Sequence, residues 1–254
     1  MAVRLSPGLC SVTLRALSPA EVVSVAAAGQ LELIEWGGDV HVPVGDLDRA
    51  REVRARTEDA GLGVCSYGSY FGRGEATDFE PVLATAIALG APRIRVWAGA
   101  QGSAATDPAG RAWVIAELRG AAELAAAAGV ELALEYHPNT LTDTAASTLA
   151  LLDEVGRGLV TYWQPPVGQA DAEALSSLRT VLDRTVTVHV FSWWPARERL
   201  PLRAREQFWR DVCGLLATKA PRGVMPMLLE FVPDDDPAAL RRDAATLREL
   251  VAAA

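Results

Sequence analysis

The chain has 254 residues, of which 50% are hydrophobic and 22% are charged, and its formal net charge is −8. This composition is typical of a globular protein and excludes a disordered one. A negatively charged chain without a Lys- or Arg-rich run also lacks the basic surface of proteins that bind nucleic acids or anionic membranes, so we expect neither partner.

Short apolar runs alternate along the chain with longer segments of helical period. The predicted strands are residues 9–14, 31–36, 63–67, 93–97, 131–136, 159–163, 185–191 and 224–231. The predicted helices are residues 19–28, 47–60, 79–89, 109–128, 145–155, 172–182, 205–217 and 237–251. Eight strand–helix units, about thirty residues apart, predict an α/β fold with a parallel sheet closed into a (β/α)8 TIM barrel. We expect one domain over residues 1–254.

Helix ends support this division of the chain. Ser18-Pro19 and Asp236-Pro237 resemble an N-cap followed by a proline in the first turn. Glycines at the predicted C-terminal ends are Gly29, Gly61, Gly90 and Gly129.

Several locations and chemistries find no support in the sequence. No apolar run reaches the length of a membrane span, and the N-terminus lacks the apolar core of a signal peptide. Cys10, Cys65 and Cys213 have no metal-binding spacing and are interpreted as reduced, buried thiols of a cytoplasmic protein. Nucleotide-binding and G-x-S-x-G motifs are absent, and Lys219 is predicted at the opposite end of the barrel from the site, which argues against a Schiff base.

Barrel enzymes build their active sites at the C-terminal ends of the strands. Candidate residues at these ends are Glu35, His41, Tyr67, Arg95, Trp97, Glu135, His137, Gln164, His189, Trp193 and Glu230. The three glutamates lie in apolar strands, where a carboxylate is costly unless it is paired or binds a metal. Their convergence on one rim predicts a functional site, although each one singly could form a structural ion pair.

The other candidates leave alternatives open. His189 is either a ligand or a satisfied core histidine, and His41 and His137 either contact substrate or pack in loops. Arg95 either binds substrate or pairs with a glutamate. The strand-end tryptophans either stack on a sugar or close the barrel, and they are Trp36, Trp97, Trp163, Trp193 and Trp194.

A set of oxygen donors with one imidazole remains, formed by Glu135, Gln164, His189 and Glu230. Such donors suit Mn²⁺, Mg²⁺, Co²⁺ or Zn²⁺. We expect one divalent ion to polarise a carbonyl while a carboxylate moves a proton at the adjacent carbon. This chemistry serves isomerisation or epimerisation, and it also serves the elimination of water beside a carbonyl.

The segments that carry a resemblance are IEWGGDVHVP (34–43), IRVWAG (94–99), LEYHPNTLT (134–142), YWQPP (162–166), HVF (189–191) and LEFV (229–232). Through these segments the whole chain resembles the sugar phosphate isomerase/epimerase family of xylose isomerase-like TIM barrels. The resemblance to its ketose 3-epimerases implies that one divalent ion is bound by Glu135, Gln164, His189 and Glu230, with Glu135 and Glu230 as the acid/base pair.

Two positions depart from those epimerases. Gln164 stands where they have an aspartate, and Val167 stands where they have a histidine. The family also contains hydroxypyruvate isomerases and dehydroshikimate dehydratases, so the resemblance implies the fold and the site more narrowly than the reaction.

We therefore expect a metal-dependent isomerase or epimerase of a small sugar, keto-sugar or polyol. The alternatives are a lyase that uses the same site and a non-catalytic carbohydrate-binding barrel. The expected substrate contacts are Glu35, His41, Tyr67, Arg95, Trp97, His137 and Trp193. Self-association into a homo-oligomer stays open.

Overall fold

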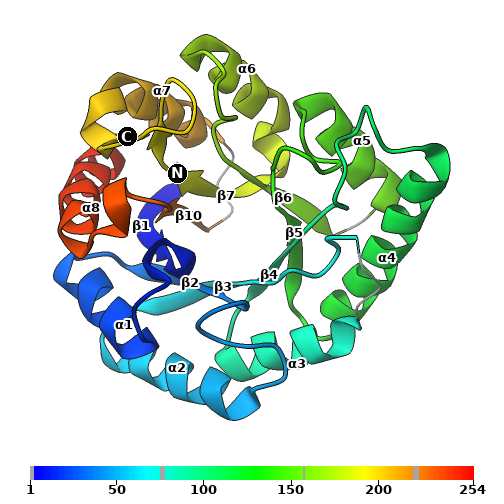
Figure 1. The fold of residues 1–254 in the computed structure, drawn as a ribbon, viewed down its shortest axis with the longest axis horizontal. Coiled ribbons are helices and arrows are strands. Elements are labelled where there is room, and N and C mark those ends of the chain that lie inside the picture. Colours follow the sequence, from blue (N-terminus) through cyan, green and yellow to red (C-terminus); the bar gives the residue numbers. More distant parts are fainter. Residues whose placement is uncertain (1–2, 75–77, 157, 220–222) are drawn as a thin grey trace.

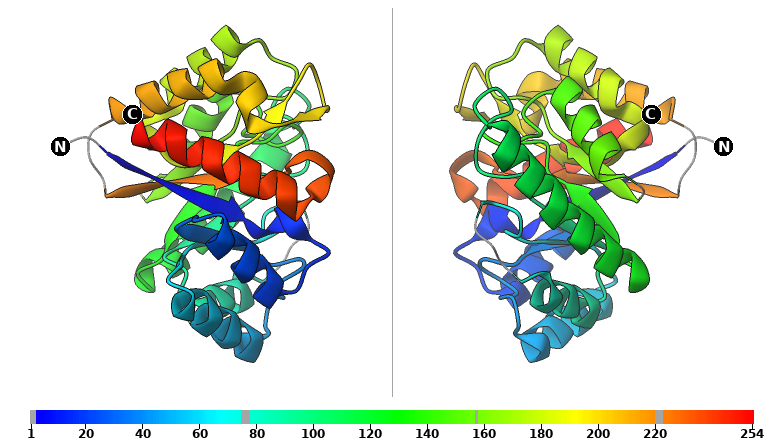
Figure 2. Two further views of the ribbon diagram at one scale, coloured as in Figure 1. Left: turned by 90° about the vertical axis from the view of Figure 1, so that its left-hand side faces the viewer. Right: turned by 90° about the vertical axis from the view of Figure 1, so that its right-hand side faces the viewer.

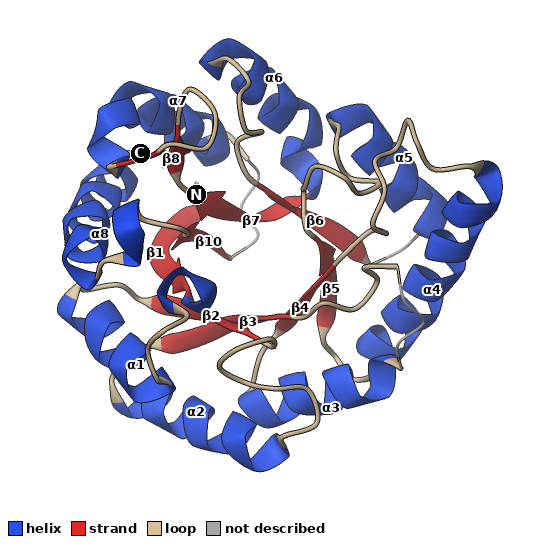
Figure 3. Ribbon diagram, viewed as in Figure 1, coloured by secondary structure: helices blue, strands red, loops and turns tan. Residues whose placement is uncertain are grey.

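Eight parallel strands close into a barrel in the computed structural model, which describes residues 3–74, 78–156, 158–219 and 223–254. Around the barrel the strand order is β1-β10-β7-β6-β5-β4-β3-β2. Figure 1 shows this ring, and Figure 3 shows the helices enclosing it on the outside. The fold is the predicted (β/α)8 barrel.

The barrel strands are β1 (Arg4–Cys10), β2 (Leu33–Gly37), β3 (Gly63–Gly68), β4 (Arg93–Val96), β5 (Glu131–Leu134), β6 (Leu159–Trp163), β7 (Thr185–Val190) and β10 (Val224–Leu229). The helices are α1 (Pro19–Ala28), α2 (Leu47–Asp59), α3 (Phe79–Leu89), α4 (Pro108–Ala127), α5 (Ala145–Val155), α6 (Asp171–Val181), α7 (Glu206–Ala217) and α8 (Pro237–Ala252). A short antiparallel hairpin of β8 (Ser192–Trp193) and β9 (Arg199–Leu200) follows β7.

The first strand lies earlier in the chain than the sequence predicts. β1 is Arg4–Cys10, and Ser11–Leu14 form a 3-10 helix in place of the predicted strand 9–14. Pro7 and Gly8 weaken the local strand pattern. Tertiary pairing overrides this, because β1 closes the barrel between β10 and β2. Cys10 is therefore the last residue of a barrel strand.

Local capping signals agree with the structure at most helix ends. Ser18 forms a capping box with Glu21, and the side chain of Asp236 accepts hydrogen bonds from the first turn of α8. Gly90 ends α3 in the left-handed conformation, with φ +73°. After α1 it is Gln30, with φ +53°, that takes the left-handed conformation, while Gly29 stays helical.

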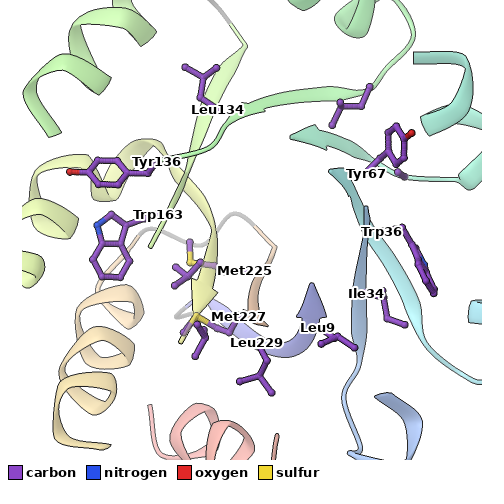
Figure 4. Packing of buried hydrophobic residues seen from close by; sticks show 14 of the residues in the cluster. Leu9, Ile34, Trp36, Tyr67, Leu134, Tyr136, Trp163, Met225, Met227 and Leu229 are labelled. Carbon is purple, nitrogen blue, oxygen red and sulfur yellow. The ribbon is translucent and has the colours of Figure 1, made fainter. Parts of the chain in front are cut away.

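Successive side chains along each strand point alternately toward the helices and toward the barrel interior. Ile34 and Trp36 of β2 join the apolar layer between the strands and the helices, while Glu35 between them faces the barrel interior, where it contacts Arg95. Figure 4 shows part of the apolar layer.

The two ends of the barrel differ in what they carry. β1 begins and α8 ends on the same side of the barrel (Figure 2). The Nζ of Lys219 donates to the carbonyl of Leu182, just before β7 begins, which confirms its predicted place away from the strand C-termini. Among the described residues, no helix combines the length and the apolar content needed to cross a membrane.

Candidate active site

Seven polar side chains from seven strands meet inside the C-terminal end of the barrel. Each lies within two residues of the C-terminal end of its strand. They are Cys10, Glu35, Arg95, Glu135, Gln164, His189 and Glu230. Their exposed fractions range from 0% for Glu35 to 8% for Gln164. These buried groups need to pair with one another or with a ligand, because burying a polar group without a partner costs folding free energy.

Arg95 links two of the carboxylates. Its Nε donates to Glu35 Oε1 at 2.9 Å, and its Nη1 donates to Glu135 Oε2. Burial opposes the charge on Arg95, but Glu135 and Glu35 raise its pKa well above the ordinary value. Burial likewise opposes the charge on Glu35, yet Arg95 and His189 hold its pKa well below the usual range. The structure thus favours the ion-pairing alternative for Arg95.

His189 lies at the centre of the cluster and faces a different group with each ring nitrogen. Its Nδ1 is 3.3 Å from Glu230 Oε2 and 3.3 Å from Gln164 Oε1. Its Nε2 forms an ion pair with Glu35 Oε1 at 3.4 Å but has no hydrogen bond of ordinary length to any described residue. Burial opposes protonation, while the Glu230 carboxylate raises the pKa of His189 well above its ordinary value. The imidazole therefore holds a proton that a metal ion would replace.

Three of the predicted metal ligands converge. One donor atom from each of Glu135, His189 and Glu230 lies within 4.8 Å of the others. The amide oxygen of Gln164 lies beside the same imidazole nitrogen. Two carboxylates, an amide oxygen and a neutral imidazole would fit an ion such as Mg²⁺ or Mn²⁺.

Aromatic side chains stand around the mouth of this cluster. Trp97 packs against His137 with ring centroids 4.7 Å apart, and Trp193 packs against Phe191 and Phe231 at 5.1 and 5.6 Å. The indole Nε1 atoms of Trp97 and Trp193 are buried and have no hydrogen-bond partner among the described residues. Each could donate to a substrate oxygen.

Two expected substrate contacts lie elsewhere. The ring of Tyr67 is fully buried in the apolar layer, and its hydroxyl donates to the Val42 carbonyl at 2.8 Å. Figure 4 shows it with Trp36 on the helix side of the strands. The expectation that Tyr67 lines the rim is wrong because β3 contains a bulge: Ile34 pairs with Val64 but Glu35 pairs with Ser66. A one-residue shift exchanges the inward and outward faces.

His41 is the second correction. Its Nδ1 lies 3.0 Å from Ser11 Oγ and its Nε2 lies 3.1 Å from the Leu17 carbonyl, and its exposed fraction is 2%. Burial lowers the pKa of this imidazole. Both nitrogens are used within the β2–α2 loop and its neighbours, so the structure favours the loop-packing alternative.

Three residues of the cluster escaped the sequence analysis as site residues. Cys10 Sγ donates to Glu35 Oε1 at 3.3 Å, and Ser66 Oγ donates to Glu35 Oε2 at 2.8 Å. Tyr162 packs edge-on against His189, and its buried hydroxyl has no hydrogen-bond partner in the described chain. Side chains alternate between the two faces of a strand, so the inward position of Gln164 predicts that Tyr162 also points inward. The wrong bounds of the first strand prevented the same inference for Cys10, and the bulge in β3 prevented it for Ser66.

Comparison with known proteins agrees with this architecture. Residues 23–249 match the family described as Xylose isomerase-like TIM barrel. The chain belongs to this family. That membership confirms the resemblance found in the sequence.

Relatives of the chain are enzymes. A 3-dehydroshikimate dehydratase from Bacillus anthracis is 30% identical over 158 residues, which are 58% of this chain. The match spans 56% of that dehydratase's length.

Solved structures share the fold over nearly the whole chain. The probable 3-DHS dehydratase AsbF from Bacillus anthracis has a TM-score of 0.74 at 22% identity, covering 96% of this chain and 98% of AsbF. A Xylose isomerase-like TIM barrel protein from Mycobacterium smegmatis, in complex with magnesium, has a TM-score of 0.70 at 17% identity, covering 98% and 97%. An L-ribulose 3-epimerase has a TM-score of 0.67 at 17% identity, covering 100% and 95%. The chain thus shares its fold with dehydratases and epimerases of this family.

Proposed function

We propose that this enzyme removes a proton beside the carbonyl of a small polyhydroxylated keto compound and expels a neighbouring hydroxyl as water. The proposed reaction is therefore an elimination rather than an epimerisation. It includes a carbohydrate-like substrate, a cytoplasmic location and one divalent ion, for which the oxygen-rich donors favour Mg²⁺ or Mn²⁺.

The observation that carries the proposal is the unequal pairing of the two glutamates. Glu135 is ion-paired with Arg95, so it must give up a guanidinium before it can accept a proton. Glu230, in the part of the chain that the structure describes, ion-pairs only with the imidazole of His189. Epimerisation by two opposed bases requires both carboxylates to transfer protons. Elimination needs one mobile carboxylate, which Glu230 supplies.

Bound by Glu135, Gln164, His189 and Glu230, a divalent ion would polarise the substrate carbonyl. Glu230 takes the proton from the adjacent carbon, and the C–H electron pair becomes the carbon–carbon double bond. The carbon–oxygen bond at the next carbon breaks, and Glu230 returns its proton to the departing hydroxyl to give water. Trp97 and Trp193 limit the access of bulk water to this step, because they pack at the mouth of the barrel.

Epimerisation of a ketose is the second candidate. One carboxylate oxygen of Glu135 lies within 4.8 Å of one of Glu230, so both groups are close enough to serve one substrate. A substrate that displaces Arg95 from Glu135 would release the second base.

Product analysis distinguishes these reactions. The enzyme with Mn²⁺ is incubated in D₂O with 3-dehydroshikimate, inososes and ketoses, and products are followed by mass spectrometry and ultraviolet absorbance. We expect loss of one water and a new conjugated absorbance, both absent in Glu230→Gln. A product of unchanged composition that carries solvent deuterium beside the carbonyl would establish epimerisation instead.

The matched control is Glu131→Gln. Glu131 is the first residue of β5, the strand that Glu135 directly follows, and it pairs with Arg93 at the opposite end of the barrel. Its activity should equal that of the wild type. Absence of any turnover by the folded, Mn²⁺-loaded wild type across this panel would contradict the proposal.

A further inference from the structure

His189 presents its second ring nitrogen to a donor set that the proposed reaction does not use. Cys10 Sγ, a Glu35 carboxylate oxygen and a nitrogen of His189 lie within 4.8 Å of one another. All three side chains are at most 1% exposed. The Nε2 atom points to this set and has no hydrogen-bond partner among the described residues. Its nearest acceptor is Glu35 Oε1 at 3.4 Å, which is longer than a good hydrogen bond, so the nitrogen is available to a ligand that draws these groups together.

The spacing of these donors matches a tetrahedral zinc-type ion. Zn–O and Zn–N bonds of about 2.0 Å and a Zn–S bond of about 2.3 Å place neighbouring donors about 3.3–3.5 Å apart. Glu35 Oε1 lies 3.3 Å from Cys10 Sγ and 3.4 Å from His189 Nε2. The sulfur of Cys10, the Glu35 oxygen and the His189 nitrogen therefore need to move little to bind one ion.

We propose that Cys10, Glu35 and His189 Nε2 form a second cation site, selective for thiophilic ions such as Zn²⁺, Cd²⁺ or Co²⁺. Thiolate and imidazole favour these ions over Mg²⁺ and Mn²⁺. Binding releases the Cys10 proton, and the sulfur electron pair forms the bond to the ion. A fourth position on the ion is left for water.

Local charge favours such an ion. With Cys10 as a thiolate, the anions around the site are Cys10, Glu35, Glu135 and Glu230, and among the described residues the neighbouring cation is Arg95. The group then carries three net negative charges, which a divalent cation reduces to one. Removal of the thiol proton without a cation would instead add an anion beside Glu35, which is unfavourable in a buried site.

Occupation of this site opposes occupation of the other. A neutral imidazole has one unprotonated nitrogen, so coordination through Nε2 leaves a proton on Nδ1, where it faces Glu230 and Gln164. A thiophilic ion should therefore exclude Mn²⁺ from the oxygen-rich set and inhibit the enzyme. The expected inhibition rests on the proposed function, whereas binding of a thiophilic ion by Cys10, Glu35 and His189 does not.

The test uses Co²⁺, because a cobalt–thiolate bond gives a charge-transfer absorption that oxygen and nitrogen ligands do not give. The full-length protein is titrated with Co²⁺ in wild type, Cys10→Ser, Cys213→Ser and Glu230→Gln. We expect the absorption to saturate near one equivalent in wild type and to disappear in Cys10→Ser. It should persist in Cys213→Ser, whose cysteine is buried on α7, and in Glu230→Gln.

Two results would overturn the proposal: no thiolate absorption in wild type, or equal absorption in folded Cys10→Ser. A second titration separates it from the proposed function. Mn²⁺ is bound first and followed by electron paramagnetic resonance while Cd²⁺ is added. Release of Mn²⁺ from wild type but not from Cys10→Ser supports exclusion. Failure to bind Mn²⁺ at all would count against the oxygen-rich site and leave the cobalt result standing.

Discussion

Arg95 places a permanent positive charge between two carboxylates of the barrel interior. Its guanidinium contacts Glu35 and Glu135, and it is only 4% exposed. A guanidinium beside a proposed ligand has two opposite effects. It stabilises the protein without a metal by pairing buried charges, and it competes with a metal for Glu135.

Arg95→Met tests both effects. We expect the metal-free protein to lose about 3 kcal/mol of folding free energy, because two buried carboxylates lose their partner. We also expect Mn²⁺ to bind more tightly and to raise the melting temperature more than it does in wild type. Thermal unfolding with and without Mn²⁺ measures both. Arg93→Met, at the opposite end of β4, is the control and should show no altered response to Mn²⁺.

Gln164 sets the charge of the proposed ligand set. With glutamine, the set contains two carboxylates, Glu135 and Glu230, which formally neutralise a divalent ion. Gln164→Glu adds a negative charge with little change in volume. We expect about tenfold tighter Mn²⁺ binding and slower turnover, because an added anion strengthens ion binding and weakens the polarisation of the substrate. Isothermal titration and initial rates check this, and unchanged affinity in a folded variant would remove Gln164 from the ligand set.

At the scale of elements, α8 carries a buried carboxylate that joins it to the segment after β9. Asp243 Oδ1 accepts a hydrogen bond from the Leu202 backbone N–H at 2.9 Å, and Asp243 is 5% exposed. Burial raises the pKa of Asp243 from 3.8 to about 6, although the Leu202 hydrogen bond acts in the opposite direction.

This carboxylate should make stability depend on pH. Between pH 3.8 and about 6 the folded chain holds a proton that the unfolded chain has lost, so this contribution to stability falls as the pH rises through that window. Asp243→Asn keeps an acceptor for Leu202 and removes the charge. We expect it to be more stable than wild type above pH 6 by about 1–3 kcal/mol, and nearly equal to it below pH 4.

Urea unfolding at a series of pH values measures the difference. Asp243→Ala is the control, because it removes both the charge and the acceptor. It should leave the Leu202 N–H unpaired and destabilise the protein at every pH. An Asn variant whose advantage does not change with pH would contradict the assigned titration.

The elements themselves were mostly predictable, because the alternation of apolar residues and the helix caps are local signals. The β8–β9 hairpin was not predicted, and neither was the position of β1, where Pro7 and Gly8 conceal a strand that forms only between β10 and β2. Because of the error in β1, the sequence pattern did not place Cys10 beside Glu35 in the site.

At the scale of the whole molecule, closure of the barrel depends on the seam that β1 makes with its two neighbours. Gly8 lies at this seam, paired with Leu228 on one side and Leu33 on the other. A Cβ at Gly8 would lie 2.6 Å from Leu228 Cδ2 and 2.7 Å from the Leu33 carbonyl oxygen. The backbone oxygen has no room to move without disturbing the sheet.

Gly8→Ala should therefore destabilise the barrel by about 3 kcal/mol, the cost of overpacking at a rigid contact. Gly120→Ala is the matched control. Gly120 lies within α4, and no atom of the described residues would lie within 4 Å of its added Cβ. It should gain about 1 kcal/mol from the higher helix propensity of alanine. Denaturant unfolding compares the two, and a Gly8→Ala protein as stable as wild type would contradict a tight seam.

Local patterns in the sequence predict the barrel, its strand–helix units and most polar residues at the strand ends, including Glu35, Glu135, His189 and Glu230. These follow from periodicity and punctuation, which act over a few neighbouring residues. The direction of each side chain and its contacts depend on the packing of distant strands. The bulge in β3 turned Tyr67 outward and Ser66 inward. The pairing of β4 with its neighbours brought Arg95 to two glutamates that lie 60 and 40 residues away along the chain. The two nitrogens of His189 face different donor sets for the same reason: register between distant strands fixes which groups meet, and no local pattern encodes that register.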